Sequence, residues 1–337
     1  MLRTVAKKVA WVGRTASVVF GLALVMALSS CGSGSQETKK PANFTPSMVF
    51  MKEDSDGFWQ TWVANKDLSD QVKLTNESAD SGWAVWKPGG AKLAFESNHT
   101  DPDLDDTNAI NDIFTMNPDG SGIVKLTHSK DVSDTPDWFP DGSRIAFGSD
   151  RHNGAWRREI YVMDSDGTNV RRLTTLPEKA EVDTQPRFSP DGRRLVFARY
   201  ISETIPIEAA LFTVRVDGSG LKQLTPWENG AEDADWSPDG TKIVFEAYPT
   251  EYSRGEVFTI DADGQQLTNL TDNFSRGFGS SDPVWSADGT KILFVSDHYF
   301  KGEDGIGLAT MNPDGTDRHH ISSNPKDEHQ PDWESVP

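Results

Sequence analysis

The chain has one cysteine, Cys31, among its 337 residues. A single thiol excludes an internal disulfide, so the fold must be stable through packing and hydrogen bonding alone. A chain of this length can bury a core large enough for that. Apolar residues at helical spacing are also absent throughout, which argues against a fold built on α-helices.

Basic residues are scarce relative to acidic ones. The chain has 33 Lys and Arg against 52 Asp and Glu, which gives a formal net charge of −19. Proteins that bind nucleic acids present a basic face to the phosphates, so we expect no nucleic-acid partner. The surplus of carboxylates favours solubility or, more specifically, a cationic or metal-bearing partner.

Long hydrophobic runs are limited to residues 16–28 (ASVVFGLALVMAL), which are too few for a membrane-spanning helix. Basic residues precede this run, and it ends in Leu28-Ser29-Ser30-Cys31. The arrangement is typical of a signal peptide, and its last four residues resemble the bacterial lipobox. The resemblance implies cleavage before Cys31 and lipidation of that residue, so residues 1–30 are predicted to be a lipoprotein signal peptide.

Residues 31–46 contain mainly small and polar residues and are predicted to be a flexible tether. We therefore expect an exported protein that contacts the membrane only through its lipid anchor. Gly32 stands where lipoproteins kept at the inner membrane often have Asp. If the host is Gram-negative, this favours the outer membrane, with the protein facing the periplasm.

Two sequence phrases alternate along the rest of the chain. The first has an aromatic residue, three residues, Gly and a short apolar run ending in Phe, as in WSPDGTKIVF at 236–245. The second has an apolar strand, Asp-Gly and then Leu-Thr, as in IYVMDSDGTNVRRLT at 160–174. Tight Asp-Gly turns connect adjacent antiparallel strands. A period of about 50 residues with four short strands is typical of β-propeller blades.

The two ends of this region each supply part of one blade. Residues 48–51 correspond to the second strand of a repeat, and residues 330–333 correspond to the first strand of another. Their pairing would close the ring and remove an open sheet edge. We therefore predict an all-β, six-bladed propeller of four-stranded antiparallel blades over residues 47–337, closed by pairing of the C-terminal strand with the N-terminal blade. We expect it to be monomeric.

The phrases WSPDGTKIVF and IYVMDSDG resemble the TolB-like, WD-repeat-like propellers of the bacterial envelope. The resemblance covers about residues 47–337 and implies the fold and a periplasmic setting. TolB itself carries an α/β domain before its propeller and is soluble, so this chain would be a lipoprotein member without that domain. Similar propellers also occur on prolyl-oligopeptidase-type enzymes. No Gly-x-Ser-x-Gly nucleophile elbow occurs here, and no catalytic residue carries over.

Antiparallel connectivity sorts the links between strands onto two rims. The short, repetitive turns within each phrase share one rim, which we call the bottom. The longer loops between phrases share the other rim, the top, where binding specificity usually lies. The acidic residues before the first strand of each blade are predicted to ring the top mouth of the channel and bind a partner, unless they only cap loop ends. They are Asp80, Asp134, Asp183, Glu232, Asp233, Asp282 and Glu328.

One top loop, residues 101–112, has the spacing of a calcium-binding loop. The acidic residues at positions 1, 3, 5 and 12 of that pattern are Asp101, Asp103, Asp105 and Asp112. Asp106 replaces the usual Gly at position 6, and Pro102 restricts the start of the loop. A calcium site and a solvated acidic loop both remain open, and no other cofactor is expected.

The leading hypothesis is a non-catalytic envelope lipoprotein that binds a protein or peptide through its acidic top loops. An alternative is a carbohydrate-binding or metal-dependent polysaccharide-lyase-like propeller, whose metal would be held by top-rim histidines. The candidates are His99, His128, His152, His298 and His329. A structural component of an envelope complex is the third hypothesis. We expect a protein that is not an enzyme.

Overall fold

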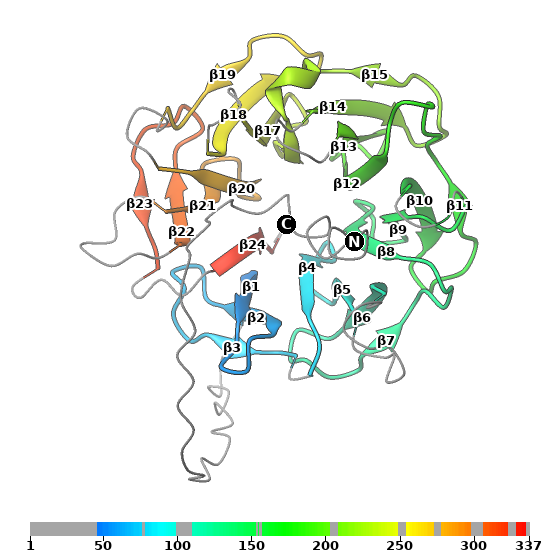
Figure 1. Cartoon of the computed structure of the whole chain (residues 1–337). Coiled ribbons are helices and arrows are strands. Elements are labelled where there is room, and N and C mark those ends of the chain that lie inside the picture. Colours follow the sequence, from blue (N-terminus) through cyan, green and yellow to red (C-terminus); the bar gives the residue numbers. More distant parts are fainter. Residues whose placement is uncertain are drawn as a thin grey trace, which may run out of the picture.

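The chain folds as a ring of six antiparallel sheets, as the computed structural model shows (Figure 1). We call the space inside the six innermost strands the central channel. The structure describes residues 46–75, 78–98, 110–152, 154, 157–202, 208–248, 254–272, 278–297, 306–322 and 328–334. The predicted six-bladed β-propeller is therefore confirmed. The predicted signal peptide, Cys31 and nearly all of the tether lie outside the described residues. Within those described residues, no helix has the length and apolar character needed to cross a membrane.

Each blade runs from an innermost strand at the channel to a two-residue outermost strand. Blade I consists of β24 (Glu328–Trp333), β1 (Met48–Glu53), β2 (Trp59–Ala64) and β3 (Val72–Lys73). Blade II consists of β4 (Ser81–Trp86), β5 (Leu93–Ser97), β6 (Asp112–Met116) and β7 (Val124–Lys125). Blade III consists of β8 (Ser133–Trp138), β9 (Arg144–Ser149), β10 (Glu159–Asp164) and β11 (Arg171–Arg172).

The other three blades follow the same plan. Blade IV consists of β12 (Val182–Phe188), β13 (Arg194–Ser202), β14 (Glu208–Arg215) and β15 (Lys222–Gln223). A turn of 3-10 helix, η1 (Trp227–Asn229), precedes blade V, which consists of β16 (Glu232–Trp236), β17 (Lys242–Ala247), β18 (Glu256–Asp261) and β19 (Thr268–Asn269). Blade VI consists of β20 (Ser280–Trp285), β21 (Ile292–Ser296), β22 (Gly307–Met311) and β23 (His319–His320).

The ring closes in blade I, where β24 pairs with β1 in antiparallel register. Met48 faces Trp333 and Val49 faces Asp332 across this pairing. The closure predicted from the two ends of the repeat region is therefore confirmed. It satisfies the backbone groups that an open edge strand would otherwise present to solvent or to another chain.

The aromatic residues of the first phrase pack between neighbouring blades. Trp138 and Phe147 of blade III share one hydrophobic cluster with Val85 and Ala94 of blade II. The phenylalanine that ends each second-strand run is at most 3% exposed in all six blades. Because these positions build the contacts between blades, their repetition in the sequence reports the fold and not a ligand site.

The threonine of the Leu-Thr phrase has a structural role in every blade. Its buried hydroxyl oxygen, or that of Ser322 in blade VI, accepts a hydrogen bond of 2.7–3.0 Å from a backbone N–H of the third strand. The bonds come from Thr61 to Thr75, Ile113 to Thr127, Ile160 to Thr174, Leu211 to Thr225, Val257 to Thr271 and Leu308 to Ser322. The two-residue outer strand is too short for a long ladder of hydrogen bonds, so this side chain adds one.

Thr174→Val, which keeps the side-chain shape and removes the acceptor, should destabilise the protein by about 1–3 kcal/mol because the Ile160 N–H stays buried without a partner. Chemical unfolding of the purified protein measures this. Thr268→Val is the matched control on the exposed outer strand β19, and it should change the free energy of unfolding by no more than about 0.5 kcal/mol. Equal effects of the two substitutions would contradict the role given to Thr174.

Candidate binding site at the top of the central channel

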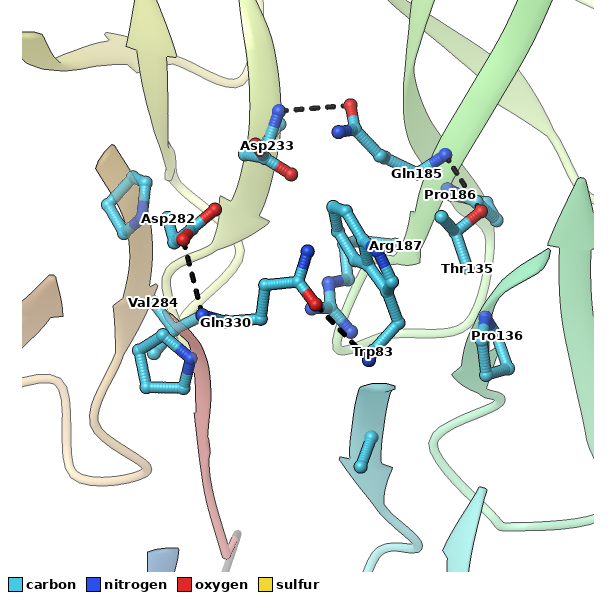
Figure 2. A pocket seen from close by; sticks show the side chains of 14 residues that line it. Trp83, Thr135, Pro136, Gln185, Pro186, Arg187, Asp233, Asp282, Val284 and Gln330 are labelled. Atoms are coloured by element: carbon cyan, nitrogen blue, oxygen red, sulfur yellow. Dashed lines mark hydrogen bonds between the residues drawn. The ribbon is translucent and has the colours of Figure 1, made fainter. Parts of the chain in front are cut away.

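Every innermost strand carries a non-glycine residue with positive φ, three positions before its terminal aromatic. The φ angles lie between 48° and 54°, at Trp83, Thr135, Gln185, Asp233, Asp282 and Gln330. The ladder with the second strand shifts register around this position in all six blades. A bulge re-aims side chains next to functional sites. All six bulge residues line one pocket in the channel (Figure 2).

Hydrogen bonds link the bulge of one blade to the bulge of the next. A side-chain oxygen at this position accepts from the backbone N–H at the same position of the following blade, each at 3.2 Å. The bonds are Gln185 N–H to Thr135, Asp233 N–H to Gln185, Gln330 N–H to Asp282 and Trp83 N–H to Gln330. The four bonds hold the strained bulges in place, so the pocket is rigid before any ligand arrives.

A glutamate takes over in the two remaining blades. In blade II the side chain of Trp83 contains no acceptor atom, and Glu96 of β5 accepts instead from the N–H of Thr135 at 2.8 Å. In blade V, Glu246 of β17 accepts from the N–H of Asp282 at 3.4 Å. Both glutamates directly follow the buried phenylalanine of the first phrase. The other four blades have no acidic residue there.

A second layer of charge lies two residues further along the innermost strands. Aspartates of alternate blades each accept a backbone hydrogen bond from the next blade. The bonds run from Phe188 to Asp137 at 2.7 Å, from Trp285 to Asp235 at 2.8 Å and from Trp86 to Asp332 at 2.8 Å. Arg187 of blade IV lies among them, with Nη1 at 3.3 Å from Oδ1 of Asp137. Three carboxylates therefore face one guanidinium across the channel.

The surroundings in this layer shift the pKa values of its aspartates. Burial raises the pKa of Asp235 to about 6 and that of Asp332 to about 7. The neighbouring carboxylates add to both shifts, whereas Arg187 and the backbone N–H groups oppose them. Asp235 and Asp332 therefore take up protons at a higher pH than an exposed aspartate does.

An acidic cluster lies beside the pocket in blade V. Glu232 and Glu246 face each other across β16 and β17, and they are 0% and 2% exposed. One carboxylate oxygen from each lies within 4.8 Å of one from Asp233. The Tyr200 hydroxyl donates a hydrogen bond to Glu232. Burial raises the pKa of Glu246 well above its usual range, and the neighbouring negative charges, that of Glu232 first, add to the shift.

The cluster of Glu232, Asp233 and Glu246 is the one grouping of three or more potential metal ligands among the described residues, and it contains no histidine. Its oxygens suit a proton or a hard cation. His128 and His152 are exposed away from it. His329 is 6% exposed and places Nδ1 at 3.7 Å from Oδ2 of Asp282. His99 and His298 lie outside the described residues.

The structure separates the seven acidic residues predicted to ring the channel mouth. Three are buried in ion pairs: Asp134 with Arg158 at 2.6 Å, Asp183 with Arg199 at 2.5 Å, and Glu328 with Lys52 at 3.1 Å. Asp80 is exposed, and its Oδ1 accepts from the N–H of Trp59 at 2.9 Å. Glu232 is buried in the acidic cluster described above. Asp233 and Asp282 alone among the seven line the channel pocket.

The candidate calcium loop is described only at its end. Asp101, Asp103 and Asp105 lie outside the described residues. Asp112 is buried in β6, accepts a hydrogen bond from Thr127 at 2.6 Å and forms an ion pair with Lys125 at 2.6 Å. These contacts tie Asp112 to the outer strand of its own blade.

Sequence reasoning missed Glu246 beside the pocket and five polar or aromatic residues that line it: Trp83, Thr135, Gln185, Arg187 and Gln330. They stand at positions that differ from blade to blade, so the repeat pattern passes over them. Two signals were present in the sequence: the position three residues before each terminal aromatic, and a glutamate after the repeat phenylalanine in blades II and V.

Asp332→Asn should flatten the pH dependence of stability and raise the melting temperature at pH 8. A carboxyl whose pKa is raised on folding binds more protons folded than unfolded between the two pKa values, so stability falls as the pH rises from about 4 to 7. The amide stays neutral and can still accept from Trp86. Thermal unfolding at pH 5 and pH 8 measures the effect.

Asp166→Asn is the control for this prediction. Asp166 lies in an exposed bottom turn and its pKa is lowered, chiefly by the hydroxyl of Thr168, so it stays charged at both pH values. Its substitution should leave the pH slope of the wild type. If the Asp332→Asn variant kept the wild-type pH dependence of stability, the assignment of this dependence to Asp332 would be wrong.

The sequence of this propeller is similar to those of several known proteins. Residues 174–336 match the family model described as the TolB beta propeller domain. The protein TolB homolog of Chlorobium luteolum is 27% identical over 174 residues, covering 51% of this chain and 34% of that protein. Dipeptidyl-peptidase 5 of Porphyromonas endodontalis is 26% identical over 194 residues, covering 58% of this chain and 23% of that protein. The chain thus spans about a third or less of the length of these two relatives.

The fold comparison agrees with the sequence comparison. The crystal structure of TolB from Acinetobacter baumannii superposes with a TM-score of 0.67 at 19% identity, covering 88% of this chain and 68% of that one. At such identity the likeness concerns the fold alone. Residues 174–336, just under half of the chain, thus match the TolB beta propeller domain, and the chain as a whole shares the TolB-like propeller fold.

Proposed function

We propose that this protein is an envelope lipoprotein that binds a protein or peptide partner at the top of its propeller channel. The observation that supports the proposal is that Asp233 and Asp282 both line the channel pocket. The buried Glu232 and Glu246 lie beside them. A concentration of carboxylates on one side of a channel attracts a cationic segment.

The chemistry of the pocket favours binding over catalysis. Its lining residues comprise Trp83, Ala84, Thr135, Pro136, Gln185, Pro186, Arg187, Asp233, Ala234, Asp282, Pro283, Val284, Gln330 and Pro331. None of them is a serine, cysteine, histidine or lysine, so the side chains that could act as nucleophiles or proton carriers are limited to Thr135, Asp233 and Asp282. A half-buried tryptophan and four prolines instead offer rigid apolar walls, which suit a peptide anchor.

The pocket is also rigid before binding. The hydrogen bonds between bulges hold six of its lining residues in a fixed register. Rigid sites lose less conformational entropy on binding, so a modest number of contacts can give useful affinity.

The double substitution Asp233→Asn with Asp282→Asn should reduce capture of the partner from native envelope extracts by about tenfold or more, since losing buried charge contacts mainly speeds dissociation. Quantitative pull-down with mass spectrometry measures it. The control is Asp217→Asn with Asp314→Asn, which removes the same charge from exposed bottom turns. Undiminished capture by the channel variant would refute the proposal.

The membrane anchor has a separate test. Cys31→Ser should abolish incorporation of labelled palmitate and release the protein from the membrane fraction, because the only thiol is lost. Ser33→Ala, two residues away, should leave both unchanged. A Cys31→Ser protein that still sediments with membranes would show that another feature holds it there.

A further inference from the structure

The side-chain amide of Gln330 has a defined orientation in the channel. Its Oε1 accepts a hydrogen bond of 3.2 Å from the backbone N–H of Trp83. A backbone N–H can only donate, so the oxygen must face Trp83 and the nitrogen must face the opposite way. In Figure 2 that nitrogen points into the pocket, toward the opening between Asp233 and Asp282.

This nitrogen is a buried donor without an acceptor among the described residues. Gln330 is 6% exposed, and its Nε2 makes no hydrogen bond within the part of the chain that the structure describes. Buried donors are almost always satisfied in folded proteins. A donor held in this way, by the same bond that links two blades, is suited to an acceptor group on a ligand.

Blades VI and V, which lie next to blade I on one side of the ring, present the complementary charge. Asp233 and Asp282 come from the neighbouring strands β16 and β20 and turn carboxylate oxygens toward the same opening (Figure 2). Glu246 adds a third carboxyl beside Asp233, and burial, followed by the surrounding negative charges, raises its pKa. A ligand that fits must therefore carry a cationic donor and an acceptor close together.

We propose that the pocket binds the free N-terminus of a partner polypeptide, with the α-ammonium at Asp233 and Asp282 and the first carbonyl oxygen at Nε2 of Gln330. In an N-terminal residue the ammonium and the carbonyl are held two bonds apart across one Cα. A lysine or arginine side chain has a cation but no acceptor beside it. The proposal rests on the proposed function and specifies which part of the partner enters the channel.

Apolar side chains border the pocket where the first residue of the ligand would lie. Trp83 and the prolines at 136, 186, 283 and 331 surround the opening. Arg187 lies on the deeper side, where its positive charge disfavours a second cation and favours the carbonyl end of the ligand. The charges of the pocket therefore orient the N-terminus, with its ammonium toward blades V and VI.

Titration calorimetry with three synthetic tripeptide amides tests the proposal on the full mature protein. The probes are Ala-Ala-Ala amide, N-acetyl-Ala-Ala-Ala amide and N-acetyl-Ala-Lys-Ala amide. We expect the free-amine peptide to bind and both acetylated peptides to bind about tenfold more weakly or not at all, because each lacks the α-ammonium. Equal binding of the first two, tighter binding of the lysine peptide, or no binding of any probe would overturn the proposal.

Substitutions in the pocket test which residue contacts the ammonium and which contacts the carbonyl of the peptide. Gln330→Leu should weaken binding of the free-amine peptide severalfold, and Asp233→Asn with Asp282→Asn should abolish it. Asp217→Asn with Asp314→Asn, on the bottom turns, should bind as the wild type does. Thermal unfolding of each variant shows whether it is folded. A Gln330→Leu protein that is folded and binds normally would remove the carbonyl contact, and with it the reason to prefer an N-terminus.

The outcome is separable from that of the proposed function. If the channel variant loses its partner but acetylation leaves tripeptide binding unchanged, the channel binds a partner by another group and this inference is wrong. If the free-amine peptide binds but partner capture is unaffected by the channel variant, the inference holds and the proposed function falls.

Discussion

The antiparallel pairing of β24 with β1 is the interaction on which the channel depends. It joins segments that lie far apart in the chain, as the bond between Lys52 and Glu328, 276 residues apart, illustrates. Closing the ring brings Gln330 of β24 beside Trp83 of blade II on one side and Asp282 of blade VI on the other. Without this pairing neither contact exists, and the pocket loses one wall.

The six innermost strands share a backbone and differ in chemistry. Each bulges at the same position, so each offers one N–H and one side chain to the ring of contacts around the channel. In four blades the side chain at the bulge accepts from the following blade. In blades II and V, a glutamate of the second strand accepts instead. The strained backbone at all six sites persists because neighbouring blades hold it from both sides.

The acidic residues of the innermost strands and their neighbours fall into two groups. Asp134, Asp183 and Glu328 are buried against basic partners of their own blades. Glu232, Asp233 and Glu246 instead gather on one side of the channel, where burial and then the neighbouring negative charges raise the pKa of Glu246. Like charges held together oppose folding, and such arrangements are common where a protein binds something of the opposite charge.

The sequence by itself determined the six blades, their closure and the two rims. Tight turns, buried aromatics and the Leu-Thr phrase are local features that repeat, so spacing alone reveals them. Only the tertiary structure decided which acidic residues face the channel. At a bulge the alternation of side chains along a strand is broken, so counting residues no longer tells which way Asp233 or Gln330 points. The cations that neutralise Asp134 and Asp183 come from residues 16 to 24 positions away, and no local pattern announces them.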